Sequence, residues 1–440
     1  MSVRPVLIYP ENRDIAISNL AVHWFFNAFE EYSPDLVTLD SNSGIFYDTK
    51  LHRTPFVFVS VSYGLSFFNF VKILKENRIP LLKKDRENGM FPILIAGGIA
   101  VMLNPEPLNL IFDAVFTGEG ECMESDIKKM MELETREAVF SFINTLPYAL
   151  TDGKESFGTT YASSGAFSVC SNKMLHKYGN CFNNRKIIEI SRGCTNRCKF
   201  CAATYAYKTF READRSKVME IVEQSIEEKQ GVALMGASLA SVSFFDEILE
   251  KCAENSISLS LSSLKAVEIT DRRISLLKKC SVRTVTVAVE SANEVTRSRI
   301  LKNLSTETIL NAMTILKKYE MKSRIYLIAG LPGTDPAKEA TDVIGLLKDL
   351  DSRKLLNETD LSIAPFAPKP FTPYAFEPMM TKKEYKIYMD VIRKGLTELE
   401  KKVKVEFFSY KDSVVDVLCG QLKGDDFIRL IQEDHSLGVN

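Results

Sequence analysis

The chain has 440 residues, of which 45% are hydrophobic and 26% charged, and its formal net charge is −1. This length exceeds one ordinary domain, and the near-neutral charge gives no general support to nucleic-acid binding. Because no apolar run is long enough to cross a membrane and the nine cysteines are unevenly spaced, we expect a cytoplasmic protein without a disulfide framework.

Residues 1–146 alternate short apolar runs with amphipathic stretches. The candidate strands cover residues 6–9, 36–39, 56–61, 93–96 and 114–117, and helical patterns cover 19–32 and 67–77. This alternation predicts a doubly wound parallel sheet of the flavodoxin or Rossmann type. Ligands bind such sheets beyond the carboxyl ends of the strands, where glycine lets the backbone approach a bound group. Four glycines lie there, with tight turns as the alternative explanation: Gly97, Gly98, Gly118 and Gly120.

The pattern breaks down over residues 147–185, which we interpret as a linker with an irregular hairpin. A second alternating series fills residues 186–380. Its strands are expected at 186–190, 232–235, 259–261, 284–289, 324–328 and 361–364. Six strand–helix units predict an α/β fold with a partial (β/α)6 barrel, whose chemistry lies at the carboxyl ends of the strands. Residues 381–440 are expected to form a small, mostly helical C-terminal extension.

Three cysteines, Cys194, Cys198 and Cys201, follow the first strand of this barrel in the run SRGCTNRCKFC. Structural zinc requires four ligands, and a [4Fe–4S] cluster is normally held by four cysteines. Three thiolates would leave one iron open to a substrate or cofactor. Phe200 can shield one face of such a cluster, with ordinary core packing as the alternative. A zinc site would lack a ligand, and a redox disulfide between two of the cysteines would leave the third unexplained.

The cysteine spacing resembles the signature of the radical SAM superfamily, where SAM is S-adenosylmethionine. Further motifs resemble those of the family that fuses a cobalamin-binding domain to a radical SAM barrel. The N-terminal motifs are YPENRDIAISNL, SVSYGL, IAGGIAVMLNPEP and GEGE. The barrel motifs are GCTNRCKFCAA, LSLSSLKA, VAVESANEVTRSRILKN, YLIAGLPGT and PFAPKPFTPYAFEP. The resemblance covers roughly residues 1–375.

This resemblance implies that the chain cleaves SAM at a [4Fe–4S] cluster to a 5′-deoxyadenosyl radical. A one-electron reductant of the flavodoxin or ferredoxin type would be a partner. The radical would serve cobalamin-linked methylation or another modification of an unactivated carbon. The N-terminal domain lacks a D-x-H-x-x-G motif, so any bound cobalamin would have no protein histidine as its lower ligand.

The resemblance also implies SAM contacts in the barrel. Gly236 and Ser238 follow a strand where related proteins place a Gly-Gly-Glu segment, although this sequence lacks the acid. Ser260 lies where the family approaches the ribose or the substrate. Glu290 would accept hydrogen bonds from SAM, with an ion pair to Arg297 or Lys302 as the alternative. Arg297 would bind the SAM carboxylate, and the adenine would contact Ile328 and Gly330.

In the N-terminal domain the implied cobalamin contacts are Tyr9, Ser60, Tyr63, Gly97, Gly98, Gly118 and Gly120. Two other functions stay open. One is a cobalamin-independent radical SAM enzyme that modifies tRNA or a peptide, with the first domain as a substrate platform. The other is a non-catalytic iron–sulfur or zinc protein. Methylthiotransferases are disfavoured, because their second cluster needs three N-terminal cysteines and residues 1–169 contain only Cys122.

Overall fold

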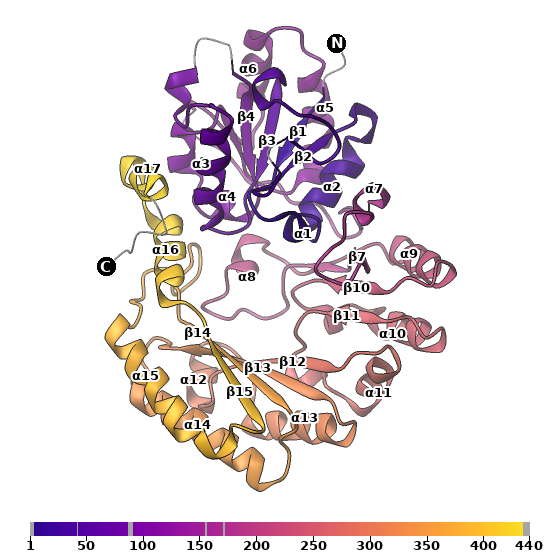
Figure 1. Cartoon of the computed structure of the whole chain (residues 1–440), viewed down its shortest axis with the longest axis vertical. Helices are drawn as coiled ribbons and strands as arrows, with labels where there is room; N and C mark the ends of the chain where they lie inside the picture. Colours follow the sequence, from indigo (N-terminus) through magenta and orange to yellow (C-terminus); the bar gives the residue numbers. More distant parts are fainter. Residues whose placement is uncertain (1–3, 42, 87–90, 155, 170–171, 434–440) are drawn as a thin grey trace. The chain divides into compact units, whose positions relative to one another are not determined.

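The computed structural model describes residues 4–41, 43–86, 91–154, 156–169 and 172–433. The chain forms two compact units (Figure 1). Unit 1 comprises Met1–Ile187 together with Val415–Asn440, and unit 2 comprises Ile188–Val414. In the described residues, no helix is both long and apolar enough to cross a membrane.

Unit 1 is built on a six-stranded sheet in the order β2-β1-β3-β4-β5-β6. Its strands are β1 (Val6–Ile8), β2 (Asp35–Val37), β3 (Phe56–Ser60), β4 (Ile93–Gly97), β5 (Ala114–Phe116) and β6 (Ala149–Leu150). The first five run parallel, which confirms the predicted doubly wound sheet. β6 pairs antiparallel with β5, in a segment that the sequence analysis assigned to the linker.

The alternation of side chains along each strand divides the core of unit 1 into two layers. In β1, for example, Val6 and Ile8 enter one layer and Leu7 enters the other. The first layer includes α3 (Ser66–Glu76) and α4 (Ile99–Leu103). The second includes α1 (Arg13–Ala16), α2 (Leu20–Ala28), α5 (Glu124–Met131) and α6 (Arg136–Thr145). Both faces of the parallel sheet are therefore buried.

The predicted linker packs onto unit 1. Thr160 forms a β-bridge with Gly118. The short helix α7 (Lys173–His176) is capped by Asn172, whose backbone N–H donates to Nδ1 of the buried His23 at 3.1 Å. These contacts explain why the first unit extends past residue 146.

The end of the chain also belongs to unit 1. The helices α16 (Tyr410–Gln421) and α17 (Gly424–Gln432) bury Val415, Phe427 and Ile431 in the layer that contains α3, beside which α17 lies (Figure 1). Asn104 donates from Nδ2 to the carbonyls of Cys419 and Leu422, both at 2.9 Å. The expected helical extension, residues 381–440, is thus divided between the two units, because only its part from Val415 onward belongs to unit 1.

Unit 2 carries two groups of parallel strands, in the orders β11-β10-β7 and β12-β13-β14-β15. The strands are β7 (Lys186–Glu189), β10 (Val232–Met235), β11 (Leu259–Leu261), β12 (Thr284–Glu290), β13 (Lys322–Ala329), β14 (Thr359–Pro365) and β15 (Val403–Phe407). An isolated bridge between Leu264 and Val287 links the two groups. These two groups therefore hold seven strands in the described residues, where six were expected. The added β15 pairs parallel with β14.

The helices of unit 2 are α8 (Ala202–Ala206), α9 (Arg215–Glu227), α10 (Phe245–Glu254), α11 (Asp271–Lys279), α12 (Glu294–Arg299), α13 (Thr306–Lys318), α14 (Pro336–Ser352) and α15 (Lys382–Gly395). Three of them begin at side chains that cap the helix. Asp214, Ser305 and Asp335 each accept a hydrogen bond from the backbone N–H three residues further on. Such caps satisfy N–H groups that have no partner within the helix.

Candidate functional site

The cysteine loop of unit 2 is held at its base by a two-stranded antiparallel hairpin. β8 (Ser191–Arg192) opens the loop and pairs with β9 (Arg211–Glu212), which closes it. Gly193 turns the chain with a φ of +71°, and a Cβ atom there would lie 2.5 Å from the carbonyl oxygen of Thr209. Glycine is required here both by the left-handed backbone and by this close approach.

The three cysteines share this one loop. Cys198 is buried, whereas Cys194 and Cys201 are half-buried. Burial raises the pKa of the Cys198 thiol to about 11, and the neighbouring ammonium of Lys302 opposes that rise. Among the described residues, no three His, Cys, Asp or Glu side chains form a group able to hold a metal ion. The three sulfurs therefore do not form a metal-binding group in this structure. The donor set nevertheless fits an iron–sulfur cluster, because three soft thiol ligands come from a single loop beside a buried cation.

A buried ion pair lies next to this loop. Lys302 Nζ is 3.1 Å from Glu290 Oε1, with side-chain exposures of 10% and 13%. The segment before Lys302 runs along the cysteine loop, since Lys199 N donates to the Ile300 carbonyl at 3.0 Å and Cys198 Sγ is 3.9 Å from the Leu301 carbonyl. Burial lowers the pKa of Lys302, but Glu290 and the thiols of Cys198 and Cys194 outweigh it, so the pKa is raised. Of the alternatives for Glu290, the structure shows the ion pair with Lys302.

The backbone that carries this ion pair is strained. Glu290 has a φ of +68° and Leu301 a φ of +57°, and each such non-glycine residue costs about 1–2 kcal/mol. The pairing of β12 with β13 also shifts between Ala288 and Glu290, a bulge of the kind that redirects a side chain. Strain of this type gathers at functional sites.

A cluster of hydroxyl groups lies on another side of the loop. Lys265 Nζ donates to Thr195 Oγ1 at 2.9 Å and to Ser241 Oγ at 3.0 Å, and it lies 3.1 Å from Glu268 Oε1. Ser238 Oγ is 2.8 Å from Ser241 Oγ and 3.4 Å from Thr195 Oγ1. Ser238 therefore contacts the cysteine loop, and its contact with SAM stays a prediction. Sequence reasoning missed Lys265 as a partner, although it is the last residue but one of the quoted motif LSLSSLKA.

Two other residues that were predicted to contact SAM, Gly236 and Ser260, contact neighbouring parts of the barrel. Gly236 packs against the hairpin, because a Cβ atom there would lie 2.4 Å from Ser191 Oγ. Its carbonyl accepts a hydrogen bond from Ser262 Oγ at 2.9 Å. Ser260 lies on β11 in register with Ala233 of β10.

Phe200 and Ile328 meet in one apolar cluster. Both pack against the buried side chains of Ile300, Leu331, Phe366 and Tyr374. The structure thus shows for Phe200 the core packing that was its alternative role. This apolar cluster also joins the cysteine loop to the end of β13, where the residues predicted to contact adenine lie.

The structure narrows the backbone contact expected from Gly330, because the Gly330 N–H already has a partner. Gly330 N donates to Glu339 Oε2 at 2.6 Å, and Glu339 also accepts from the N–H of Leu331. Glu339 is buried, and burial raises its pKa to about 7. Because a carboxylate of the chain takes the Gly330 N–H, this group is not available to an adenine base.

The carboxylate-binding role expected for Arg297 is corrected as well. Its guanidinium is fully buried. It donates to the carbonyls of Leu304, Ser291 and Ala292 at 2.7–2.9 Å, and to Thr306 Oγ1 at 2.7 Å. Arg297 therefore ties the segment before α12 to the segment that leads into α13, and its donors do not point to a ligand.

In unit 1, three of the predicted close-approach glycines meet the chain itself. A Cβ atom would lie 2.6 Å from the Val61 carbonyl oxygen at Gly98, 2.4 Å from Thr160 Oγ1 at Gly118, and 2.4 Å from the Trp24 ring at Gly120. Packing within the chain therefore explains why each of them is a glycine, and their contact with a cofactor stays a prediction.

The carboxyl ends of β3 and β4 are different. A Cβ atom at Gly97 would meet nothing within 4 Å, and its register partner Ser60 has a buried hydroxyl without a partner in the described residues. Nearby, Tyr63 is exposed, while Tyr9 is buried and hydrogen-bonded to Ser62, and burial raises the pKa of Tyr9 to about 12. Open space beside an unsatisfied hydroxyl fits a polar group of a ligand.

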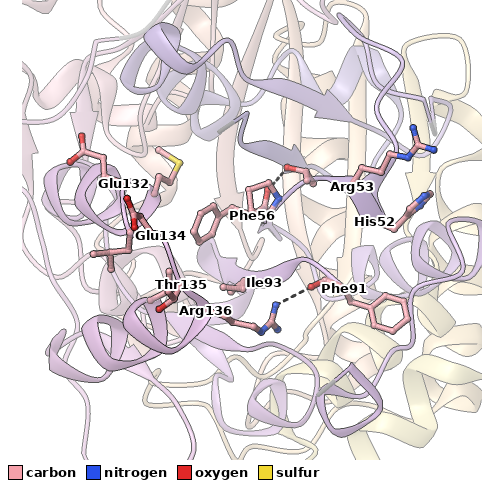
Figure 2. A pocket seen from close by; sticks show the side chains of 14 residues that line it. His52, Arg53, Phe56, Phe91, Ile93, Glu132, Glu134, Thr135 and Arg136 are labelled. Carbon is pink, nitrogen blue, oxygen red and sulfur yellow. Dashed lines mark hydrogen bonds between the residues drawn. The ribbon is translucent and has the colours of Figure 1, made fainter. Parts of the chain in front are cut away.

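A cavity of about 700 Å³ opens at the opposite ends of the same strands, where β3 and β4 begin at Phe56 and Ile93. Figure 2 shows His52 and Arg53 on one side and Glu132 and Glu134 on another. No predicted site residue lines this cavity.

Comparisons with known proteins match the part of the chain that contains the cysteine loop. A family model described as the radical SAM superfamily matches residues 188–342, and one described as the N-terminal part of radical SAM proteins matches residues 30–146. The chain belongs to the radical SAM superfamily. It also has the two-domain fold of cobalamin-dependent radical SAM enzymes, as the following solved structures show.

TsrM of Kitasatospora setae, a radical SAM methyltransferase solved with cobalamin and a [4Fe–4S] cluster, matches with a TM-score of 0.62 at 14% identity. That match covers 86% of this chain and 78% of TsrM. OxsB, a cobalamin-dependent SAM radical enzyme, matches with a TM-score of 0.58 at 15% identity over 90% of this chain and 56% of OxsB. The Methanocaldococcus jannaschii protein MJ0966 is 27% identical over an alignment of 436 residues, which covers 96% of this chain and 88% of that protein.

Proposed function

We propose that this radical SAM enzyme cleaves SAM reductively at a [4Fe–4S] cluster held by Cys194, Cys198 and Cys201, and that it methylates an unactivated carbon with the help of cobalamin. The observation that carries the proposal is the single loop with three thiols beside the buried Lys302. When bound, the reduced cluster supplies the electron that converts SAM to methionine and a 5′-deoxyadenosyl radical. A flavodoxin or ferredoxin would deliver that electron.

The residues around the loop suit this task. Phe200, Ile328 and Leu331 form an apolar wall that would exclude water from a reactive radical. The hydroxyls of Thr195 and Ser238 and the ammonium of Lys265 offer polar partners for the methionine end of SAM, in place of the missing Gly-Gly-Glu acid. Glu290 keeps its proposed place near SAM, although one of its oxygens is bound to Lys302.

Reconstitution under anaerobic conditions tests the cluster part of the proposal. The wild-type chain, supplied with iron, sulfide and a strong reductant, is expected to form 5′-deoxyadenosine from SAM. Cys198→Ala is expected to abolish that product, because two thiolates cannot hold the cluster. Cys181→Ala removes an exposed cysteine elsewhere and serves as the control. Equal product from Cys198→Ala and wild type would refute the ligand assignment.

The cobalamin part is supported by the fold shared with TsrM and OxsB and by the open space at Gly97 beside Ser60. The wild-type chain is expected to retain hydroxocobalamin through gel filtration, measured by its visible absorbance. Gly97→Leu should lose it, because the new side chain fills that space. Gly345→Leu places the same side chain at an equally open position on α14 and should retain it. Absence of retained corrin from the wild type would remove cobalamin from the proposal.

A further inference from the structure

We infer that the buried Lys302–Glu290 pair sets the reduction potential of the cluster bound by the cysteine loop. This inference rests on the proposed function, because it concerns the same cluster. Lys302 would act as a fixed positive charge, and Glu290 would hold that charge in place and partly offset it.

The position of Lys302 supports this role. Its side chain is nine-tenths buried, and the residue before it contacts the Cys198 sulfur through its carbonyl at 3.9 Å. Charges interact more strongly in a buried, low-dielectric setting than in water. Other cations near the loop have different partners: Arg192 binds Glu189 at 2.9 Å, and Lys199 lies over the Tyr374 ring.

The pair is built to stay in place. Glu290 lies at a bulge in β12 and holds a left-handed backbone conformation outside any helix end, which the surrounding structure must maintain. Leu301 has the left-handed conformation that commonly follows a helix, here α12, and it places Lys302 directly after the end of that helix.

The direction of the effect follows from electrostatics. Reduction adds one negative charge to the cluster, so a fixed ammonium nearby stabilises the reduced state and raises the reduction potential. Removing the ammonium should lower the potential. Removing the charge of Glu290 should raise it, because the ammonium is then less offset. A purely structural pair predicts no such opposite signs.

Electron paramagnetic resonance of the anaerobically reconstituted full chain, poised at a series of fixed potentials, measures this effect. Lys302→Met is expected to lower the ratio of reduced to oxidised cluster about tenfold at a given potential, which is about 59 mV for a one-electron couple. Glu290→Gln should raise the ratio. Lys302→Arg should stay near wild type, as should Lys318→Met, which removes an exposed lysine paired with Asp271.

Iron content measured on every sample separates the outcomes. If the wild type holds no cluster, the proposed function fails and this inference with it. If the clusters are intact and Lys302→Met and Glu290→Gln both match wild type, or shift in the same direction, only the inference is overturned. If Lys302→Met loses its iron, the other two variants test the inference. A raised ratio of reduced to oxidised cluster in Glu290→Gln, together with a wild-type ratio in Lys302→Arg, supports it, and any other result overturns it.

Discussion

At the scale of single residues, Arg297 shows how a side chain that resembles a ligand contact can be structural. Its guanidinium satisfies three backbone carbonyls and one hydroxyl in a fully buried position. Arg297→Met should lower the free energy of unfolding by roughly 3 kcal/mol, because buried acceptors lose their donors. Urea unfolding measures this loss. A variant with wild-type stability and weakened SAM binding would instead restore the carboxylate-binding role.

Glu339 gives a prediction for pH. Its folded pKa of about 7 lies above the ordinary value of 4.5, so the folded state binds more protons than the unfolded state between these values. Stability should therefore fall as pH rises through this window, by about 3 kcal/mol in all. Glu339→Gln keeps an acceptor for Gly330 N but cannot titrate, so it should remove the fall in stability. Glu406→Gln, at an exposed position on β15, is the control and should keep the fall. Parallel pH profiles of wild type and Glu339→Gln would contradict this account.

The residues of the cysteine loop were predictable because their spacing is local in sequence. The partners of Arg297 and Gly330 were not, since a backbone carbonyl or a carboxylate nine residues away leaves no pattern. The crowding at Gly98, Gly118 and Gly120 was equally invisible, because Val61, Thr160 and Trp24 come from other elements.

At the scale of elements, the strands with strong apolar runs were predicted to within about two residues. β6 was missed because it has two residues, and β15 because its single short run stands among helical patterns.

The helix α17 is expected to stabilise unit 1 through its apolar face. Phe427 is fully buried, and its ring meets that of Phe67 from α3 edge to face at 5.3 Å. Phe427→Ala should lower the free energy of unfolding by about 3–5 kcal/mol. Thermal unfolding monitored by circular dichroism measures the loss, with the exposed Phe376→Ala as the control. Equal losses in both variants would contradict the placement of α17.

At the scale of the whole molecule, the two units do not follow the order of the chain. Unit 1 takes its last helices from beyond the barrel, and unit 2 keeps α15 and β15. Composition and periodicity separate two alternating series, but they do not reveal which series a terminal helix joins, because that depends on long-range burial. The α/β class, the doubly wound sheet and the barrel with its cysteine loop were predictable.

The central claim is that three thiolates of one loop leave an iron of the cluster open to SAM. The most direct measurement is electron–nuclear double resonance on the reduced, reconstituted chain mixed with SAM carrying ¹⁵N at its amino group. We predict a hyperfine coupling between that nitrogen and the cluster. A reduced cluster without such coupling, at saturating SAM, would contradict the account.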